Sequence, residues 1–175
     1  SPILAANGGY VLFEGKDLYG LEALVKLTED LLPSHPNIGI VIYIRKGAEK
    51  DKGYFCDTLA KAHGKILKDH ILFYESDVEF YHFFSICDVF LRPTLTDGDA
   101  NSIREALYFS VPVIASDVVP RPEGCILYSA GKYEGLVEKT KSTLDDLPNA
   151  KKRIANVPQY NAAEKLVKLY RELLG

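Results

Sequence analysis

Short apolar runs alternate with segments of helical periodicity along most of the chain. Runs rich in β-branched and aromatic residues predict strands at residues 10–14, 38–44, 71–74, 88–91, 111–115 and 126–128. Apolar residues three and four positions apart predict helices at about 18–31, 52–68, 78–86, 103–109, 133–147 and 162–174. The continuous apolar run at 38–44 is typical of a strand that is covered on both faces.

This alternation predicts the class of fold. Strands that alternate with helices form βαβ crossovers, so we expect an α/β fold in three layers: a mainly parallel sheet, helices on both faces and further helices at the C-terminal end. Ligands bind such sheets beyond the carboxyl ends of the strands, where the strand order reverses. The loops that we expect to carry the site therefore begin at Gly15, Arg45, Glu75, Arg92 and Ser116.

Length and composition indicate one soluble globular domain. The chain has 175 residues, of which 47% are hydrophobic and 26% charged, and its net charge of -3 predicts no broad basic surface for nucleic acid. The apolar runs are too short to cross a bilayer. Cys56, Cys87 and Cys125 have no metal or redox spacing, so we interpret them as reduced, mostly buried thiols of a cytoplasmic protein. The chain has no Met and begins Ser-Pro-Ile, as an excised fragment would.

The stretch from 92 to 124 carries the most chemistry. Its sequence, RPTLTDGDANSIREALYFSVPVIASDVVPRPEG, predicts a strand end, a loop of acidic and small polar residues, a helix and a second strand. The loop brings backbone N–H groups to a helix N-terminus, which attracts phosphate. Gly98 permits close backbone approach, and Asn101 or Ser102 suits the N-cap. Glu105, one turn into the helix, would accept hydrogen bonds from vicinal hydroxyl groups.

The same residues also fit a purely structural explanation. Ser102-Ile103-Arg104-Glu105 matches a capping box, in which the Glu105 carboxylate accepts a hydrogen bond from the N-cap amide. Asp97 and Asp99 are common residue types in loops. The residue pattern alone leaves the two explanations open.

The stretch also resembles a motif of a known family. RPTLTDGDANSIREALYFSVPVIASD is similar, without a gap, to a segment of the retaining family-four (group 1) glycosyltransferases. That segment reads roughly PS-x-x-EGFG-x-x-x-LEA, followed by G-x-PV-I-AS-D. FEGK at 13–16, CDVFLRP at 87–93 and AAEKLVKLYRELL at 162–174 extend the resemblance over nearly the whole chain. In that family the segment belongs to the C-terminal, nucleotide-sugar-binding domain of a two-domain (GT-B) enzyme.

The resemblance implies a single Rossmann-like donor-binding domain over residues 1–175, the C-terminal half of a longer enzyme. It places Glu105 on the donor ribose, Asp97 against the transferred sugar and Lys16 against the diphosphate, so we expect Asp97 and Lys16 to act in catalysis. The donor-binding residues that it implies are Gly15, Lys16, Arg45, Glu75, Gly98, Asp99, Ala100, Asn101, Ser102 and Glu105.

Two positions depart from the family pattern. Asp97 stands where the family has a glutamate, so its carboxylate reaches one methylene less far. Tyr19 precedes Gly20 where the family has a lysine. Arg45 or Lys46 would compensate for the lost charge, although two solvated loop cations would give the same sequence.

The resemblance implies retaining transfer of a hexose from a nucleotide-sugar donor to a glycan or lipid-linked acceptor, as in polysaccharide biosynthesis, with no metal and no cofactor. The acceptor would bind an N-terminal domain that precedes this chain, so we expect this chain alone to bind donor and to transfer little. We expect a cytoplasmic protein, with peripheral contact of the full-length protein to the inner face of the membrane as an option. A non-catalytic nucleotide- or sugar-binding module and a GT-B sugar epimerase stay open as alternatives.

Overall fold

The computed structural model of the chain describes residues 1–47, 50–157 and 162–174. In this part of the chain a parallel sheet of six strands has the order β5-β4-β1-β6-β7-β8. Its strands are β1 (Ile3–Gly8), β4 (Gly39–Arg45), β5 (Ile71–Ser76), β6 (Val89–Arg92), β7 (Val113–Ser116) and β8 (Ile126–Tyr128). The predicted α/β fold with a parallel sheet is confirmed.

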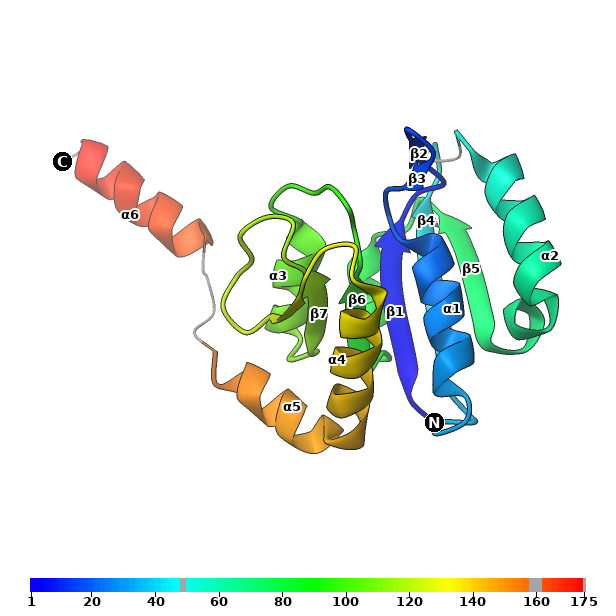
Figure 1. Cartoon of the computed structure of the whole chain (residues 1–175). Helices are drawn as coiled ribbons and strands as arrows, with labels where there is room; N and C mark the ends of the chain where they lie inside the picture. Colours follow the sequence, from blue (N-terminus) through cyan, green and yellow to red (C-terminus); the bar gives the residue numbers. More distant parts are fainter. Residues whose placement is uncertain (48–49, 158–161, 175) are drawn as a thin grey trace.

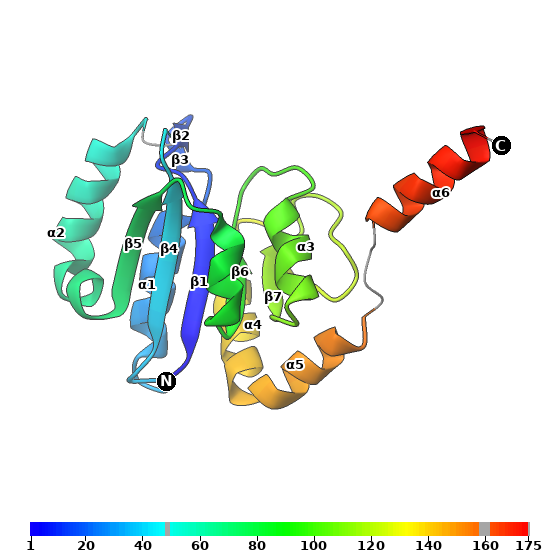
Figure 2. The same cartoon turned by 180° about the vertical axis from the view of Figure 1, so that it is seen from behind.

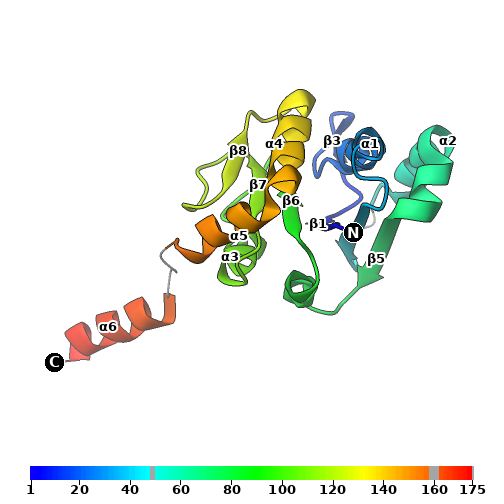
Figure 3. The same cartoon turned by 90° about the horizontal axis from the view of Figure 1, so that it is seen from below.

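Helices cover both faces of this sheet, which gives three layers (Figures 1, 2 and 3). Helices α1 (Leu21–Leu31), α2 (Lys52–His70) and α4 (Tyr133–Asp145) share one buried apolar cluster with one face of the sheet. The 3-10 helix η1 (Phe80–Ser85), α3 (Asn101–Tyr108) and α5 (Leu147–Ala155) share a second cluster with the other face. Helix α6 (Ala162–Leu174) lies away from both layers in Figure 1.

The strand order reverses between β1 and β6. After β1 the chain forms β4 and then β5 on one side, and it returns to place β6, β7 and β8 on the other side. Strands β1 and β6 pair directly, with Ala6 opposite Leu91. Their carboxyl ends therefore lie next to each other, at the place where open α/β sheets bind ligands.

The predicted first strand at residues 10–14 is wrong. The strand in the sheet is β1, and residues 12–13 and 16–17 instead form a small antiparallel hairpin, β2 (Leu12–Phe13) with β3 (Lys16–Asp17). The sequence ILAANG has a weak apolar signal because it combines two large apolar residues with two alanines, Asn and Gly. Its burial comes from its central place between β4 and β6.

This correction also changes the overlay on the family. The FEGK segment at 13–16, which carries part of the resemblance, lies on the hairpin and not at the end of a strand of the main sheet. The loop that follows the first strand begins at Gly9 rather than at Gly15.

The loops after β1 and β6 lie in direct contact. The backbone N–H of Leu95 donates to the carbonyl of Leu18 at 2.9 Å. Gly20 has a φ of 73°, and a Cβ atom at this position would lie 2.7 Å from the carbonyl oxygen of Pro93. This close approach therefore requires glycine, for both its backbone conformation and its lack of a side chain.

The structure corrects three smaller predictions, on the aromatic segment at 78–86, the helices after residue 133 and the burial of the cysteines. The aromatic segment predicted as a helix at 78–86 is helical, but it is the short 3-10 helix η1. Helix α5, which has Pro148 in its first turn, is separate from α4 and was not predicted. The three cysteines are free, but only Cys87 is buried, while Cys125 is intermediate and Cys56 is exposed.

Candidate functional site

A cavity of about 340 Å³ opens at the carboxyl ends of β1 and β6. It lies where the strand order reverses, as the topology predicts. Its lining comes from several loops and strand ends and from the start of α3. The lining residues are Asn7, Gly8, Tyr19, Tyr43, Arg45, Asp77, Glu79, Phe80, Arg92, Ala100, Asn101, Ser102 and Glu105.

The start of α3 faces this cavity and has no side-chain cap. Ala100 occupies the N-cap position, and neither Asn101 nor Ser102 caps the helix. Ser102 Oγ instead donates to Asn7 Oδ1 at 3.4 Å. The first backbone N–H groups of a helix have no partner inside it. They leave a region of positive potential beside the cavity.

Glu105 does not form the capping box that the sequence allowed. Among the described residues, its carboxylate accepts no hydrogen bond, although the side chain is partly buried against the cavity. Burial raises the pKa of Glu105, and the negative charge of Glu79 raises it further. An unpaired, partly desolvated carboxylate is well suited to accept hydrogen bonds from a ligand.

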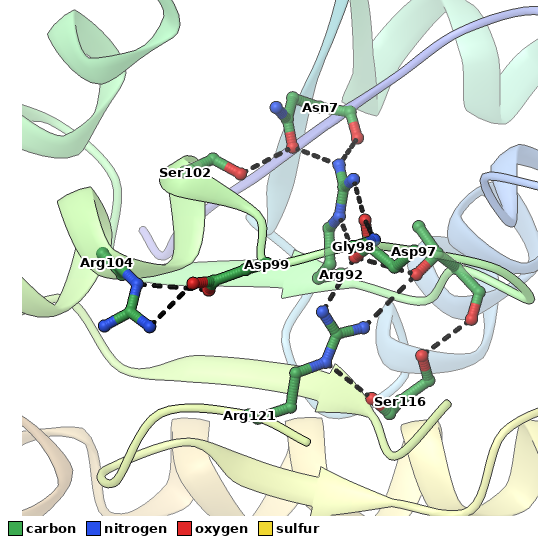
Figure 4. Close-up of polar contacts among 10 residues, drawn as sticks. Asn7, Arg92, Asp97, Gly98, Asp99, Ser102, Arg104, Ser116 and Arg121 are labelled. Carbon is green, nitrogen blue, oxygen red and sulfur yellow. Dashed lines mark hydrogen bonds and ion pairs between the residues drawn. The ribbon is translucent and has the colours of Figure 1, made fainter. Parts of the chain in front are cut away.

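Asp97 lies in a buried cluster between two arginines (Figure 4). Arg92 donates to both of its oxygens, from Nε and Nη2, at 2.9 Å each, and Arg121 Nη1 donates to Oδ2 at 2.8 Å. Thr94 Oγ1 and the Gly98 amide add donors at 3.3 and 3.0 Å. The side chains of Asp97 and Arg121 are only 7% and 1% exposed. Both carboxylate oxygens are thus engaged.

The charge state of Asp97 follows from this cluster. Burial raises the pKa of Asp97, but the hydrogen bonds and positive charges of Arg92 and Arg121 outweigh burial and bring its pKa down to about 2. The carboxylate is therefore ionised throughout the physiological range of pH.

Arg92 joins this cluster to the cavity. Its Nη1 donates to the carbonyl oxygen and to Oδ1 of Asn7, at 3.0 and 2.8 Å, which ties the end of β6 to the end of β1 (Figure 4). Its guanidinium also lies over the Tyr19 ring, 5.7 Å from the centroid. Sequence reasoning missed Asn7, Arg92 and Arg121 as site residues. An arginine at a strand end gives no local signal of burial, so no sequence pattern pointed to their role.

The structure brings some of the predicted donor-binding residues together. Arg45, Ala100, Asn101, Ser102 and Glu105 line the cavity from two separate parts of the chain. This group includes the loop and helix that the sequence singled out.

Other predicted residues lie outside this cavity. Glu75 accepts hydrogen bonds from Lys52 Nζ at 2.6 Å and from the Tyr10 hydroxyl at 3.1 Å, and the Lys52 ammonium lowers its pKa. Asp99 pairs with Arg104 at 2.9 Å on the surface. The Gly98 amide is bound to Asp97, as described above.

Gly15 and Lys16 lie on the β2–β3 hairpin. They line a neighbouring cavity of about 330 Å³, together with Pro93 and Leu95 of the loop after β6. The roles that the resemblance gives to residues outside the first cavity, Lys16 and Asp97 included, stay predictions.

Two further features bear on cofactors and membranes. Within the described ranges, no group of three His, Cys, Asp or Glu residues is placed to hold a metal ion. None of the helices described here has both the length and the apolar character that crossing a membrane requires.

The sequence model of the family described as Glycosyl transferases group 1 matches residues 10–167. The chain belongs to this family. Membership agrees with the resemblance at the level of group 1 glycosyltransferases. No curated protein sequence matches the chain.

Several solved structures share the fold of this chain. Anabaena HepE in complex with UDP and glucose has a TM-score of 0.73 at 12% identity, over 98% of this chain and 47% of that protein. A Rickettsia africae glycosyltransferase has a TM-score of 0.69 at 16% identity, over 99% of this chain and 48% of that one. For the pneumococcal O-GlcNAc transferase GtfA, solved with UDP and GlcNAc, the values are 0.69 and 15%, over 98% of this chain and 36% of that one. The chain thus spans at most about half of each protein.

Proposed function

We propose that this chain is the donor-binding half of a glycosyltransferase that uses a nucleoside diphosphate sugar and transfers the sugar with retention. One observation carries the proposal: the unpaired carboxylate of Glu105 and the uncapped start of α3 face the same cavity at the strand-order reversal. Family membership supports the reaction class. The structures of HepE with UDP and glucose and of GtfA with UDP and GlcNAc support the donor class.

In this proposal each part of the cavity takes one part of the donor. Glu105 accepts hydrogen bonds from the ribose hydroxyls, because a carboxylate offers several acceptor sites. The N–H groups at the start of α3 bind a phosphate. The base lies toward Tyr43, Arg45 and Phe80, at the side of the cavity formed by the ends of β4 and β5.

The finer roles come from the resemblance. Lys16 would stabilise the departing diphosphate, and electrostatic stabilisation of this kind often contributes more to catalysis than any other effect. The resemblance also gives Asp97 a contact with the transferred hexose, a role that competes with its pairing to Arg92 and Arg121. The loop that carries Asp97 is joined to the loop after β1 by the Leu95–Leu18 hydrogen bond, so both residues lie on neighbouring loops.

The remaining steps belong to the whole protein. The acceptor, a glycan or a lipid-linked sugar, would bind an N-terminal domain, since the solved proteins are about twice as long as this chain or longer. We propose a cytoplasmic enzyme that contacts the inner face of the membrane peripherally, as suits a lipid-linked acceptor.

Replacement of Glu105 by Gln tests the donor site. Because Glu105 makes no hydrogen bond to the described residues, Glu105→Gln should leave the fold intact and weaken nucleotide-sugar binding by about tenfold, the value of one charge-assisted hydrogen bond. Titration calorimetry with UDP-, GDP- and ADP-sugars measures the affinity. Glu138→Gln on α4, which removes an exposed carboxylate paired with Lys139, is the matched control. Equal affinities of the wild type and Glu105→Gln would reject the ribose role.

A non-catalytic binding module is the second candidate. It is favoured by Asp97, whose two oxygens are engaged by Arg92 and Arg121 and so are not free for a sugar. Activity of the full-length protein distinguishes the two candidate functions. A full-length protein that binds nucleotide sugars but neither hydrolyses nor transfers them would be a module.

A further inference from the structure

We propose that Arg92 binds a donor phosphate in this cavity and that Asp97 and Arg121 hold Arg92 in position. The inference rests on the proposed donor site and identifies a residue for it to which the resemblance gives no role. Under this proposal Asp97 is a positioning residue rather than a contact of the transferred sugar.

The hydrogen bonding of Arg92 leaves one donor for a ligand. A guanidinium has five N–H donors, one on Nε and two on each Nη. Nε and Nη2 each donate once to Asp97, and Nη1 donates twice to Asn7. One N–H on Nη2 therefore has no partner among the described residues. Because Arg92 lines the cavity, this donor is available to a ligand there.

The balance of charge around Asp97 leaves a positive charge at the cavity. Two guanidinium groups share one carboxylate, so the cluster carries one net positive charge. Arg121 is almost fully buried and does not line the cavity, whereas Arg92 does. The excess charge therefore faces the cavity through Arg92. The Arg92 side chain is only 10% exposed, and a buried charge is screened by salt less than a surface charge.

Arg92 also lies beside other groups that suit a phosphate. Arg92 and Ser102 both donate to Asn7 Oδ1, which fixes the Asn7 side chain between β6 and α3. The Asn7 Nδ2 group has no hydrogen bond to the described residues, so it offers further N–H donors. These donors and the start of α3 line the same cavity. A phosphate there would meet one cation and several amides.

The need for such a cation follows from the rest of the lining. Asp77, Glu79 and Glu105 bring three carboxylates to the cavity, against Arg45 and Arg92. Asp77 is partly neutralised by Lys46 at 3.3 Å. Without Arg92 the lining would keep Arg45 as its one guanidinium against these carboxylates, and the cavity would repel a diphosphate.

Titration calorimetry on the 175-residue chain tests Arg92. The probes are UDP, GDP and ADP together with uridine, guanosine and adenosine, so that each diphosphate is compared with its own nucleoside. Arg92→Gln should weaken the binding of the preferred diphosphate by about tenfold or more and leave its nucleoside within about twofold. Arg104→Gln is the matched control, because it breaks an exposed Arg–Asp pair on the same loop and helix, outside the cavity.

The ratio of the affinity for the diphosphate to the affinity for its nucleoside separates the possible results. Equal losses for both probes, or no loss, would overturn the role of Arg92 while the donor site stands. A wild-type chain that binds none of the three diphosphates would reject the donor site and this inference together. If circular dichroism shows that Arg92→Gln is unfolded, Arg92→Lys replaces it in the test. Because lysine keeps the positive charge but loses the two-pronged hydrogen bonding, Arg92→Lys should lower the ratio of diphosphate affinity to nucleoside affinity by less than about tenfold. An unchanged ratio would overturn the role of Arg92.

Asp97→Asn tests the positioning role. If Asp97 only holds Arg92, this variant should change the affinities for the nucleoside diphosphate and for the corresponding nucleotide sugar by the same factor. A contact with the transferred sugar would make the loss larger for the nucleotide sugar. That larger loss would overturn the assignment of Asp97 as a positioning residue.

Discussion

Asp97 shows how one methylene changes what a residue can do. The group 1 motif has a glutamate at this position in the resemblance, whereas here the shorter side chain lies between two guanidinium groups and accepts from both. A longer side chain would move the carboxylate away from this arrangement. The aspartate at 97 thus fits the two arginines that bind it, and the three residues depend on one another.

Stability should depend on pH through Asp97. Its folded pKa of about 2 lies below the ordinary value of 3.8, so the stability that it contributes is present above pH 4 and is lost as the pH falls from about 4 to about 2. Asp97→Asn should lower the unfolding free energy by about 3 kcal/mol at pH 7, because it leaves two buried guanidiniums without a counter-ion.

Urea unfolding of the wild type and Asp97→Asn at several pH values measures this effect. The difference between the two proteins should shrink below pH 4. Asp99→Asn, which breaks an exposed pair, should change stability by about 0.5 kcal/mol or less. A difference for Asp97→Asn that is the same at pH 7 and pH 2.5 would contradict the assigned cause.

At the scale of elements, two glycines with the same backbone conformation allow the cost of backbone strain to be distinguished from the cost of a steric clash. Gly15 and Gly20 both have a φ of 73°, but a Cβ at Gly15 meets nothing within 4 Å, whereas one at Gly20 would meet the Pro93 carbonyl at 2.7 Å. Gly15→Ala should cost about 1 kcal/mol of stability, from the left-handed conformation alone. Gly20→Ala should cost at least about 2 kcal/mol more, because the loops after β1 and β6 must separate. Urea unfolding measures both, and equal costs would rule out the close approach.

Element type was predictable where the local apolar pattern was clear, in short strands such as β6 and β8 as well as in longer elements. Strand β4 and helices α1, α3 and α6 lie within a few residues of their predicted places. Strand β1 was missed because its alanines resemble neither a buried strand nor a loop in a local window. Burial of such a strand depends on neighbours that are far away in the sequence.

The candidate site was also predictable only where it depends on a local sequence pattern. The cavity wall around 100–105 follows from a local pattern of loop and helix start. Asn7 and Arg92 were not predicted as site residues, because their roles depend on two strand ends that are 85 residues apart in the sequence and adjacent in the sheet. No local window contains both ends, so this part of the site required the fold.

At the scale of the whole molecule, α6 adds little to the stability of the domain. Its side chains from 164 to 174 are exposed, including Leu166, Leu169 and Leu173. A chain that ends at Val157 should therefore unfold at the same urea concentration as the full chain, within about 0.5 kcal/mol in free energy. A marked loss of stability would show that α6 packs on the domain in solution.

The arginine pair around Asp97 has an evolutionary consequence. Arg92 ends β6, Asp97 lies in the next loop, and Arg121 lies in the loop after β7, so one cluster connects two separate parts of the chain. Loss of Asp97 leaves two buried guanidinium groups without a counter-ion, and loss of either arginine removes hydrogen-bond donors from a buried carboxylate. Substitution of these residues should be tolerated only in combination. Among homologous sequences we therefore expect positions 92, 97 and 121 to covary, with a glutamate at 97 found mainly where both arginines are absent.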